Sequence, residues 1–195
     1  MTTEPATLRK NLWKTLLPVG VILVLIVVGL KIVQLQFASR KASPGGASSA
    51  VVNETGSVVP DFVLSRFGGG TVRLSELKSK VTLINFWATW CEACVEEMPS
   101  IVKLHNAYKD KGFGVLAVNL DDNPDAVIPK ALKQLGIDFP VYIDPDGKLA
   151  SVFDVHAIPL TAIIDKDRKV LMLLNGGRDW NTKDIQTQVE KWLSP

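Results

Sequence analysis

The feature that most constrains the fold is a single stretch, residues 81–99, with the sequence V-T-L-I-N-F-W-A-T-W-C-E-A-C-V-E-E-M-P. Its first half is a nearly continuous apolar run rich in β-branched and aromatic residues, which predicts a buried strand. Its second half carries Cys91 and Cys94 in a Cys-x-x-Cys spacing, followed by a helical pattern. At a helix N-terminus, unpaired backbone N–H groups and the helix dipole favour a thiolate at Cys91. The stretch therefore predicts thiol–disulfide chemistry where a strand meets a helix.

A length of 195 residues fits one domain with an additional segment outside it. A net charge of +2 is too small to indicate nucleic-acid binding. Both cysteines of the chain lie in the one motif, which leaves no disulfide framework and no four-ligand zinc site. A bridge between them closes a very short loop and would stabilise little. A redox role is therefore favoured over a structural one.

The N-terminal region predicts a membrane anchor over residues 15–37, after a cytoplasmic leader of residues 1–14. Residues 15–30 carry no charge, and Lys31 can extend toward the lipid headgroups. A helix of about 19 residues spans roughly 28 Å, close to the thickness of a bilayer core. The alternative is a cleaved signal peptide, which needs small residues at its cleavage site, and the nearest candidate site, at residues 36–38, is poor.

Basic residues lie on both sides of this span, so charge does not set its orientation. We place the N-terminus inside, because short leaders commonly stay in the cytoplasm. Residues 38–57, rich in Ser, Gly, Ala and Pro, are expected to form a flexible linker. The catalytic domain, residues 58–195, would then face the extracytoplasmic side of a bacterial inner membrane.

The pattern within residues 58–195 predicts an α/β domain. Strands are expected at residues 60–64, 71–74, 81–86, 113–120, 139–143, 161–164 and 170–174. Helices are expected from residue 75 (a short one) and over residues 91–111, 125–135, 149–153 (a turn or short helix) and 181–193. The first two and the last two strands form hairpins, the first across a glycine-rich turn. This order indicates a mixed sheet with helices on both faces.

The motif Trp-Ala-Thr-Trp-Cys-Glu-Ala-Cys at residues 87–94 resembles the thioredoxin superfamily. The chain is most similar to the membrane-tethered TlpA/ResA-type thiol–disulfide oxidoreductases. Other features are also similar to this family. They are the leading P-D-F-x-L segment, an inserted αβ segment over residues 125–143 and the loop over residues 155–161. The resemblance covers residues 58–195 and implies a thioredoxin-like fold and an enzyme without a cofactor or metal.

Thiol exchange needs an attacking thiolate and a second thiol that resolves the mixed disulfide. Cys91, at the exposed helix start, is expected to attack, and Cys94, one turn further in and more buried, to resolve. The resemblance implies that Pro159 follows a cis peptide bond and packs on the pair. Ile158 would then present its backbone N–H and C=O to an extended substrate strand. The alternative interpretation of Pro159 is an ordinary loop proline.

Glu97 lies three residues after Cys94, on the same helix face. The resemblance assigns such an acid to proton transfer at the cysteines, and the alternative is a solvated helix face of the kind expected for Glu96. Asn85 occupies the strand position where cytoplasmic thioredoxins carry a buried acid. We therefore expect Glu97 to supply that role from the helix.

Trp90, Glu92, Ala93 and Ile158 are the expected client contacts. Ala93 stands where many relatives have proline, and this difference bears on the choice of partner and on the redox potential. Glu92 and Glu97 are both expected to disfavour the Cys91 thiolate. A less stabilised thiolate makes a weaker oxidant, hence a reductant of other proteins' disulfides.

The resemblance suggests as clients the haem-attachment cysteines of apocytochrome c, copper-site proteins or oxidatively damaged proteins. It suggests re-reduction by a membrane thiol donor of the CcdA/DsbD kind, and a monomer is expected. A thiol peroxidase is one alternative, but its P-x-x-x-T/S-x-x-C setting is absent. A copper metallochaperone or redox-inert binding module is another, because two thiolates can hold copper(I).

Overall fold

The computed structural model describes residues 31, 52 and 54–194 of the chain. The chain divides into two units, residues 1–47 and 48–195, and the second unit contains every described residue except Lys31. The predicted leader, the anchor over residues 15–37 and most of the linker lie outside the described residues, apart from Lys31, which is helical. Within the described part of the chain, no helix combines the length and apolar character that crossing a membrane requires.

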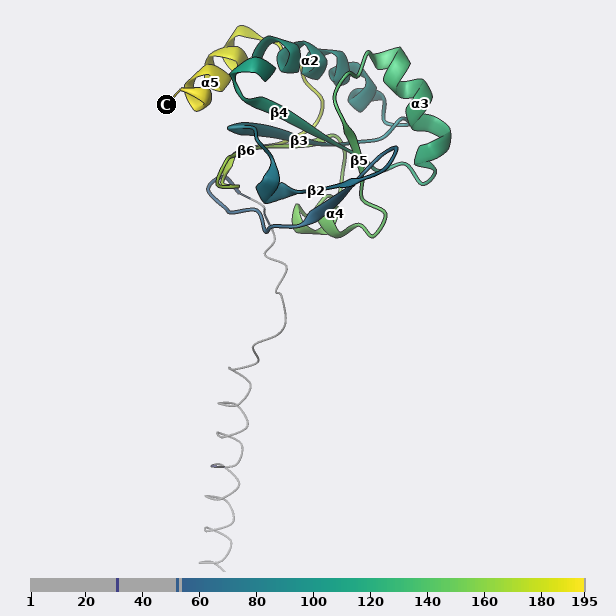
Figure 1. The fold of residues 1–195 in the computed structure, drawn as a ribbon, viewed down its shortest axis with the longest axis horizontal. Coiled ribbons are helices and arrows are strands. Elements are labelled where there is room, and N and C mark those ends of the chain that lie inside the picture. Colours follow the sequence, from purple (N-terminus) through teal and green to yellow (C-terminus); the bar gives the residue numbers. More distant parts are fainter. Residues whose placement is uncertain (1–30, 32–51, 53, 195) are drawn as a thin grey trace, which may run out of the picture. The chain divides into compact units, whose positions relative to one another are not determined.

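A seven-stranded mixed sheet forms the middle of the domain, in the order β2-β1-β5-β4-β3-β6-β7 (Figure 1). The predicted central strand is present as β3, Val81–Trp87, and all seven of its residues are buried. It pairs in parallel with β4, Phe113–Asn119, and antiparallel with β6, Leu160–Asp165. β5, Val141–Ile143, continues the sheet in parallel beyond β4.

Hairpins form both ends of the sheet, as the sequence predicts. β1, Val63–Arg66, pairs antiparallel with β2, Thr71–Arg73. Their connection contains three glycines with positive φ, at residues 68–70, a conformation that glycine adopts without steric cost. At the other end, β6 pairs antiparallel with β7, Val170–Asn175.

Helices cover both faces of the sheet, as predicted (Figure 1). They are α2 (Glu92–Tyr108), α3 (Pro124–Leu135), α4 (Lys148–Val152) and α5 (Lys183–Leu193), with short 3₁₀ helices at Leu74–Glu76 and Lys109–Lys111. Buried residues of α2, α3 and α5 share one hydrophobic cluster, whereas those of α4 belong to the other. The two clusters therefore lie on opposite faces of the sheet.

Alternation along β3 decides which side chains meet α2. Leu83 and Trp87 belong to the cluster that contains α2, whereas Ile84 and Phe86 belong to the other. Successive side chains of a strand point to opposite faces, so Asn85 shares the α2 face with Leu83 and Trp87. A polar residue thus stands among apolar neighbours directly beneath the helix that carries the cysteines.

Packing against the domain begins earlier in the chain than the predicted boundary at residue 58. Val52 is 1% exposed, and its backbone N–H donates to the carbonyl of Val152 at 2.7 Å. Gly56 N–H donates to the carbonyl of Val170 at 2.8 Å. The end of the predicted linker therefore pairs by its main chain, which composition does not reveal.

Element ends differ from the sequence prediction by one to three residues where capping decides them. α5 begins at Lys183 rather than at residue 181, because the Thr182 side chain accepts a hydrogen bond from Ile185 N–H and caps the helix. α2 ends at Tyr108, and the next three residues form a 3₁₀ turn that closes at Gly112 with φ of 103°.

Candidate active site

The two cysteines lie at the start of α2, shortly after the end of β3, and they form a disulfide with a Cα–Cα distance of 5.2 Å. Cys91 is the N-cap residue of α2, and its Sγ accepts a hydrogen bond from the Cys94 N–H at 3.2 Å. This N–H is one of the helix-start donors that have no partner within the helix. In the reduced protein, the same donor would stabilise a thiolate at Cys91.

Burial separates the two sulfurs in the expected order. Cys91 is 8% exposed, whereas Cys94 is 0% exposed. Cys91 is thus less open than its place at a helix start suggests, but of the two it is the one that solvent and a partner can reach. This order agrees with attack by Cys91 and resolution by Cys94.

The expected proline loop lies beside the pair. The Ile158–Pro159 peptide bond is cis, and the Sγ of Cys91 is 3.7 Å from the carbonyl oxygen of Ile158. Pro159 is buried and Ile158 is half-buried, so the backbone of Ile158 flanks the more accessible sulfur. Pro159 is therefore not an ordinary loop proline.

The other expected contact residues, next to the cysteines in the chain, differ in how far their side chains are exposed. Trp90, an expected contact residue, is 70% exposed and lies on the surface, whereas Trp87 is 0% exposed and lies in the core. Glu92 is exposed and Ala93 is half-buried. All three expected contact residues adjoin a cysteine in the chain, and Trp90 and Glu92 are exposed beside the pair.

Asp121, which the sequence analysis missed, holds the loop before the cysteines. Its carboxylate accepts hydrogen bonds from the Thr89 N–H at 2.9 Å and from the Thr89 hydroxyl at 2.7 Å. It also accepts one from Asn119 Nδ2 at 2.7 Å. Asp121 follows β4, the parallel neighbour of β3, and adjacent parallel strands bring their carboxyl ends to one edge. That adjacency is the signal that could have identified it.

Glu97 is buried, with 3% of its surface exposed, whereas Glu96 is exposed. The alternative of a solvated helix face is therefore wrong for Glu97. Its Oε1 accepts from Asn85 Nδ2 at 2.8 Å, and its Oε2 accepts from the Trp180 indole N–H at 3.0 Å and the Arg178 N–H at 3.2 Å. Burial raises the pKa of Glu97, opposed by these three hydrogen bonds and by the charge of Arg178.

The loop between β7 and α5 covers Glu97. Trp180 is fully buried and its backbone N–H donates to the Ser100 hydroxyl at 2.9 Å. Gly177 lies against Ala93, where an added Cβ would come within 3.0 Å of the Ala93 carbonyl oxygen. This loop therefore packs directly on Ala93, one of the two residues between the cysteines.

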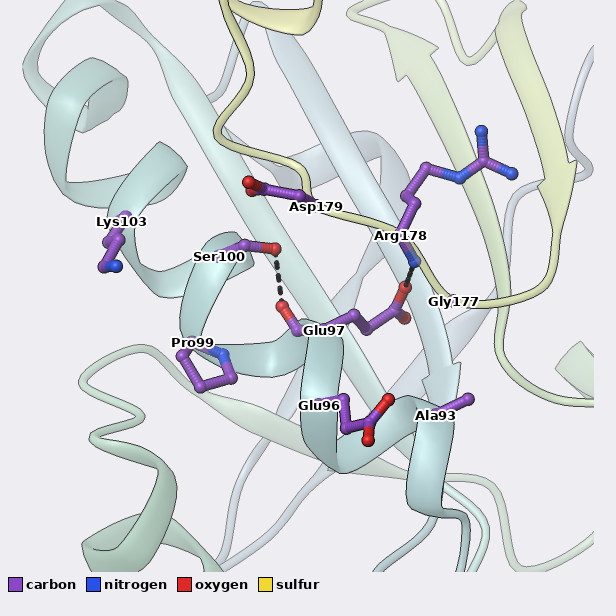
Figure 2. A pocket seen from close by; sticks show the side chains of 9 residues that line it. All are labelled: Ala93, Glu96, Glu97, Pro99, Ser100, Lys103, Gly177, Arg178 and Asp179. Atoms are coloured by element: carbon purple, nitrogen blue, oxygen red, sulfur yellow. Dashed lines mark hydrogen bonds between the residues drawn. The ribbon is translucent and has the colours of Figure 1, made fainter.

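Figure 2 shows the surface pocket beside this contact, with a volume of about 490 Å³. The Arg178 backbone points at the Glu97 carboxylate, whereas its guanidinium extends away from it. The pocket is lined by Ala93, Glu96, Glu97, Pro99, Ser100, Lys103, Gly177, Arg178 and Asp179.

Neither histidine joins the cysteines. His105 packs edge-on against Phe139, and burial lowers its pKa. His156 pairs with Asp154 at 3.0 Å on the surface. In the part of the chain that the structure describes, no group of three or more His, Cys, Asp or Glu side chains could hold a metal ion.

The sheet order, the helix-capping disulfide and the adjoining cis-proline define a thioredoxin-like thiol–disulfide oxidoreductase. The Redoxin family matches residues 54–189, and the chain belongs to this family. It is 34% identical to the thiol-disulfide oxidoreductase ResA of Bacillus thuringiensis subsp. konkukian over 140 residues, which are 72% of this chain and 77% of that protein. It is also 34% identical to the ResA of Bacillus subtilis over 158 residues, 80% of this chain and 82% of that one.

Solved structures agree with this assignment. A candidate thiol:disulfide interchange protein DsbE from Chlorobium tepidum superposes with a TM-score of 0.65 at 34% identity, covering 73% of this chain and 100% of that one. The thioredoxin domain of a thiol-disulfide oxidoreductase from Bacteroides vulgatus does so with a TM-score of 0.63 at 26% identity, with 73% and 100% covered. The chain is therefore an enzyme of ResA type that exchanges thiols and disulfides.

Proposed function

We propose that the chain reduces disulfides of client proteins on the extracytoplasmic side of the bacterial inner membrane. The observation that carries the reductive chemistry is the arrangement around Cys91, whereas the location rests on the membrane anchor that the sequence predicts over residues 15–37. The Cys91 sulfur caps α2 and lies 3.7 Å from the Ile158 carbonyl, while a carboxyl group, Glu97, is buried one turn beyond Cys94. The first two features suit attack on a partner disulfide, and the third suits a weak oxidant.

In the reductive direction, the Cys91 thiolate attacks one sulfur of the client disulfide. A bond forms between Cys91 Sγ and that sulfur, the client S–S bond breaks, and the other client sulfur leaves as a thiolate. The Cys94 thiolate then attacks Cys91 Sγ, which forms the Cys91–Cys94 disulfide and releases the second client thiolate. Two electrons pass from the cysteine pair to the client.

Glu97 takes up and returns the proton of the resolving thiol in this scheme. The group suits that role because burial raises its pKa above the ordinary value, while three N–H donors hold its carboxylate in place. The negative charges of Glu92 and Glu97 disfavour the Cys91 thiolate, which makes the oxidised pair a weak oxidant.

A client binds as an extended strand along Ile158 and contacts Trp90, Glu92 and Ala93. The position of Ile158 supports this mode, because the residue is only half-buried and its carbonyl lies beside Cys91, where main-chain groups can pair with a visiting strand. By family, clients include the haem-attachment cysteines of apocytochrome c. A membrane thiol donor of the CcdA/DsbD kind re-reduces the pair, and the protein acts as an anchored monomer.

The test is reduction of insulin disulfides, followed by trapping of the client. The wild-type protein is expected to accelerate reduction, and Cys91→Ser is expected to fall to the uncatalysed rate. Cys94→Ala should accumulate a mixed disulfide whose partner mass spectrometry identifies. Equilibration of the wild-type pair against glutathione then tests the direction, and a potential as oxidising as that of the periplasmic oxidant DsbA would overturn the reductive assignment.

A further inference from the structure

Asn85 joins the two elements that flank the cysteine pair. Its Nδ2 donates one hydrogen bond to Glu97 Oε1 at 2.8 Å and another to the Thr161 hydroxyl at 2.9 Å. Both amide hydrogens are therefore used. Glu97 belongs to α2, whereas Thr161 lies on β6, two residues after the cis-proline, and is the register partner of Asn85 in the sheet.

The same side chain leaves its other polar atom without a partner. Asn85 is 0% exposed, and its Oδ1 has no hydrogen-bond partner among the described residues. A buried carbonyl without a partner costs free energy. An apolar residue of similar volume would avoid that cost among the apolar neighbours of Asn85. The benefit of an amide here must come from its two N–H groups, which bind Glu97 and Thr161.

Burial disfavours the carboxylate form of Glu97, but its hydrogen-bond partners favour it. Its described hydrogen-bond partners, the Asn85 amide, the Arg178 N–H and the Trp180 indole N–H, are all donors. A protonated carboxyl group needs an acceptor for its proton, and none of these three groups presents one to Glu97, because Asn85 faces it with Nδ2 rather than Oδ1. Of the charged side chains around the pocket (Glu96 and Lys103 from α2, Arg178 and Asp179 from the loop), Arg178 acts on Glu97 by its charge. β3 and β6 contribute only the neutral Asn85 and Thr161 here.

We infer that Asn85 is a positioning residue for thiol exchange. Its amide binds both the Glu97 carboxylate on α2 and the Thr161 hydroxyl on β6. It therefore links the group that accepts a proton from the cysteine pair to the strand that follows the cis-proline. The inference rests on the proposed role of Glu97 in proton transfer. It assigns Asn85 a role of its own, which is to favour the ionised acid and to fix its place relative to Cys94.

The test compares Asn85→Leu with a matched control on the same strand. Thr82→Val removes the hydroxyl of another buried residue of β3, which contacts Ser79 rather than the active site. The readouts are the pH profile of insulin reduction and the titration of the Glu97 carboxyl carbon by NMR. Loss of one donor to a buried carboxylate should move both midpoints upward by about one pH unit in Asn85→Leu. Thr82→Val should follow wild type in both.

The outcomes separate this inference from the proposed function. An upward shift of the Glu97 titration with an unchanged pH profile would uphold the positioning role of Asn85 and refute proton transfer by Glu97. If Glu97 in folded Asn85→Leu titrates at the same pH as in wild type, the inference is overturned.

Thr161→Val offers a second route if Asn85→Leu does not fold. It removes the partner that orients the amide and should give a shift in the same direction but of smaller size. An unshifted titration in Thr161→Val would then count against the link to β6. In a Glu97→Gln background, Asn85→Leu should have no further effect on the pH profile, because coupled residues are not additive.

Discussion

The two sides of the cysteine pair are built differently. On the proline side, the Sγ of Cys91 meets main-chain atoms of a half-buried residue, Ile158, next to the largely exposed Trp90. On the other side, the loop between β7 and α5 covers a buried carboxyl group, Glu97, with the fully buried Trp180. One side is open to a partner and the other is closed by the protein's own side chains.

This difference between the two sides indicates that thiol exchange needs two environments that a single surface cannot provide. A client needs an accessible backbone edge beside the attacking sulfur. An acid whose pKa lies above its ordinary value needs to be removed from water. The first turn of α2 separates these two environments, with Cys91 facing one and Cys94 followed by Glu97 facing the other. Substitutions on the closed side should therefore affect stability, whereas those on the open side should affect client binding.

The largest effect is expected from Trp180→Ala. The substitution removes a fully buried indole and the N–H that it donates to Glu97. Truncating a buried aromatic residue costs about 3–5 kcal/mol of unfolding free energy. Urea unfolding followed by circular dichroism measures the loss. Trp192→Ala on α5, where the tryptophan is only partly buried, is the control, and an equal loss in both variants would contradict the comparison.

A smaller loss is expected from Gly177→Ala. The added Cβ would lie 3.0 Å from the Ala93 carbonyl oxygen, which is backbone and cannot easily move away. Crowding of this kind costs about 1–3 kcal/mol, and it should push the loop away from α2. The measurements are urea unfolding and the rate of insulin reduction. Gly177 is not among the glycines with positive φ, so any loss reports this crowding rather than a strained backbone conformation. An unfolding free energy equal to that of wild type would show that the contact with Ala93 is not tight.

The buried acid predicts a pH dependence of stability. Burial raises the pKa of Glu97 above its ordinary value of 4.5. Between that value and the raised pKa, the folded state keeps a proton that the unfolded state has lost, so the contribution of Glu97 to stability falls as pH rises. The unfolding free energy of wild type relative to Glu97→Gln should therefore decrease across this window and level off above it. Glu96→Gln, at an exposed position, is the control and should show no such trend.

The smallest effect on stability is expected on the open side, from Trp90→Ala. The side chain is 70% exposed, and surface substitutions usually change the unfolding free energy by no more than about 0.5 kcal/mol. The KM for a protein client should rise, because an exposed aromatic beside the sulfur provides contact area to a partner. Steady-state kinetics with insulin and with a small disulfide separate the two effects. If Trp90→Ala lowers the unfolding free energy by more than about 1 kcal/mol, Trp90 stabilises the fold rather than serving as a contact for a partner.

Much of this site could be predicted from local sequence. The apolar run at residues 81–86 predicted β3, and the Cys-x-x-Cys spacing at a helix start predicted both the disulfide and the order of burial of its sulfurs. The resemblance predicted the cis bond before Pro159. What local pattern could not supply was the partners of Glu97, because Arg178 and Trp180 follow it by 81 and 83 residues. Asp121 was missed for the same reason, as it is 32 residues from Thr89.

The sequence by itself determined the strand, the helix and the placing of two sulfurs at their junction, because periodicity and spacing act over a few residues. The tertiary structure decided that Glu97 is buried while the adjacent Glu96 is exposed, and that Ile158 lies beside a sulfur 67 residues away in the chain. Burial and contact of this kind depend on which distant segment packs over a side chain. The free energy that selects such packing is summed over the whole core rather than encoded in any one stretch.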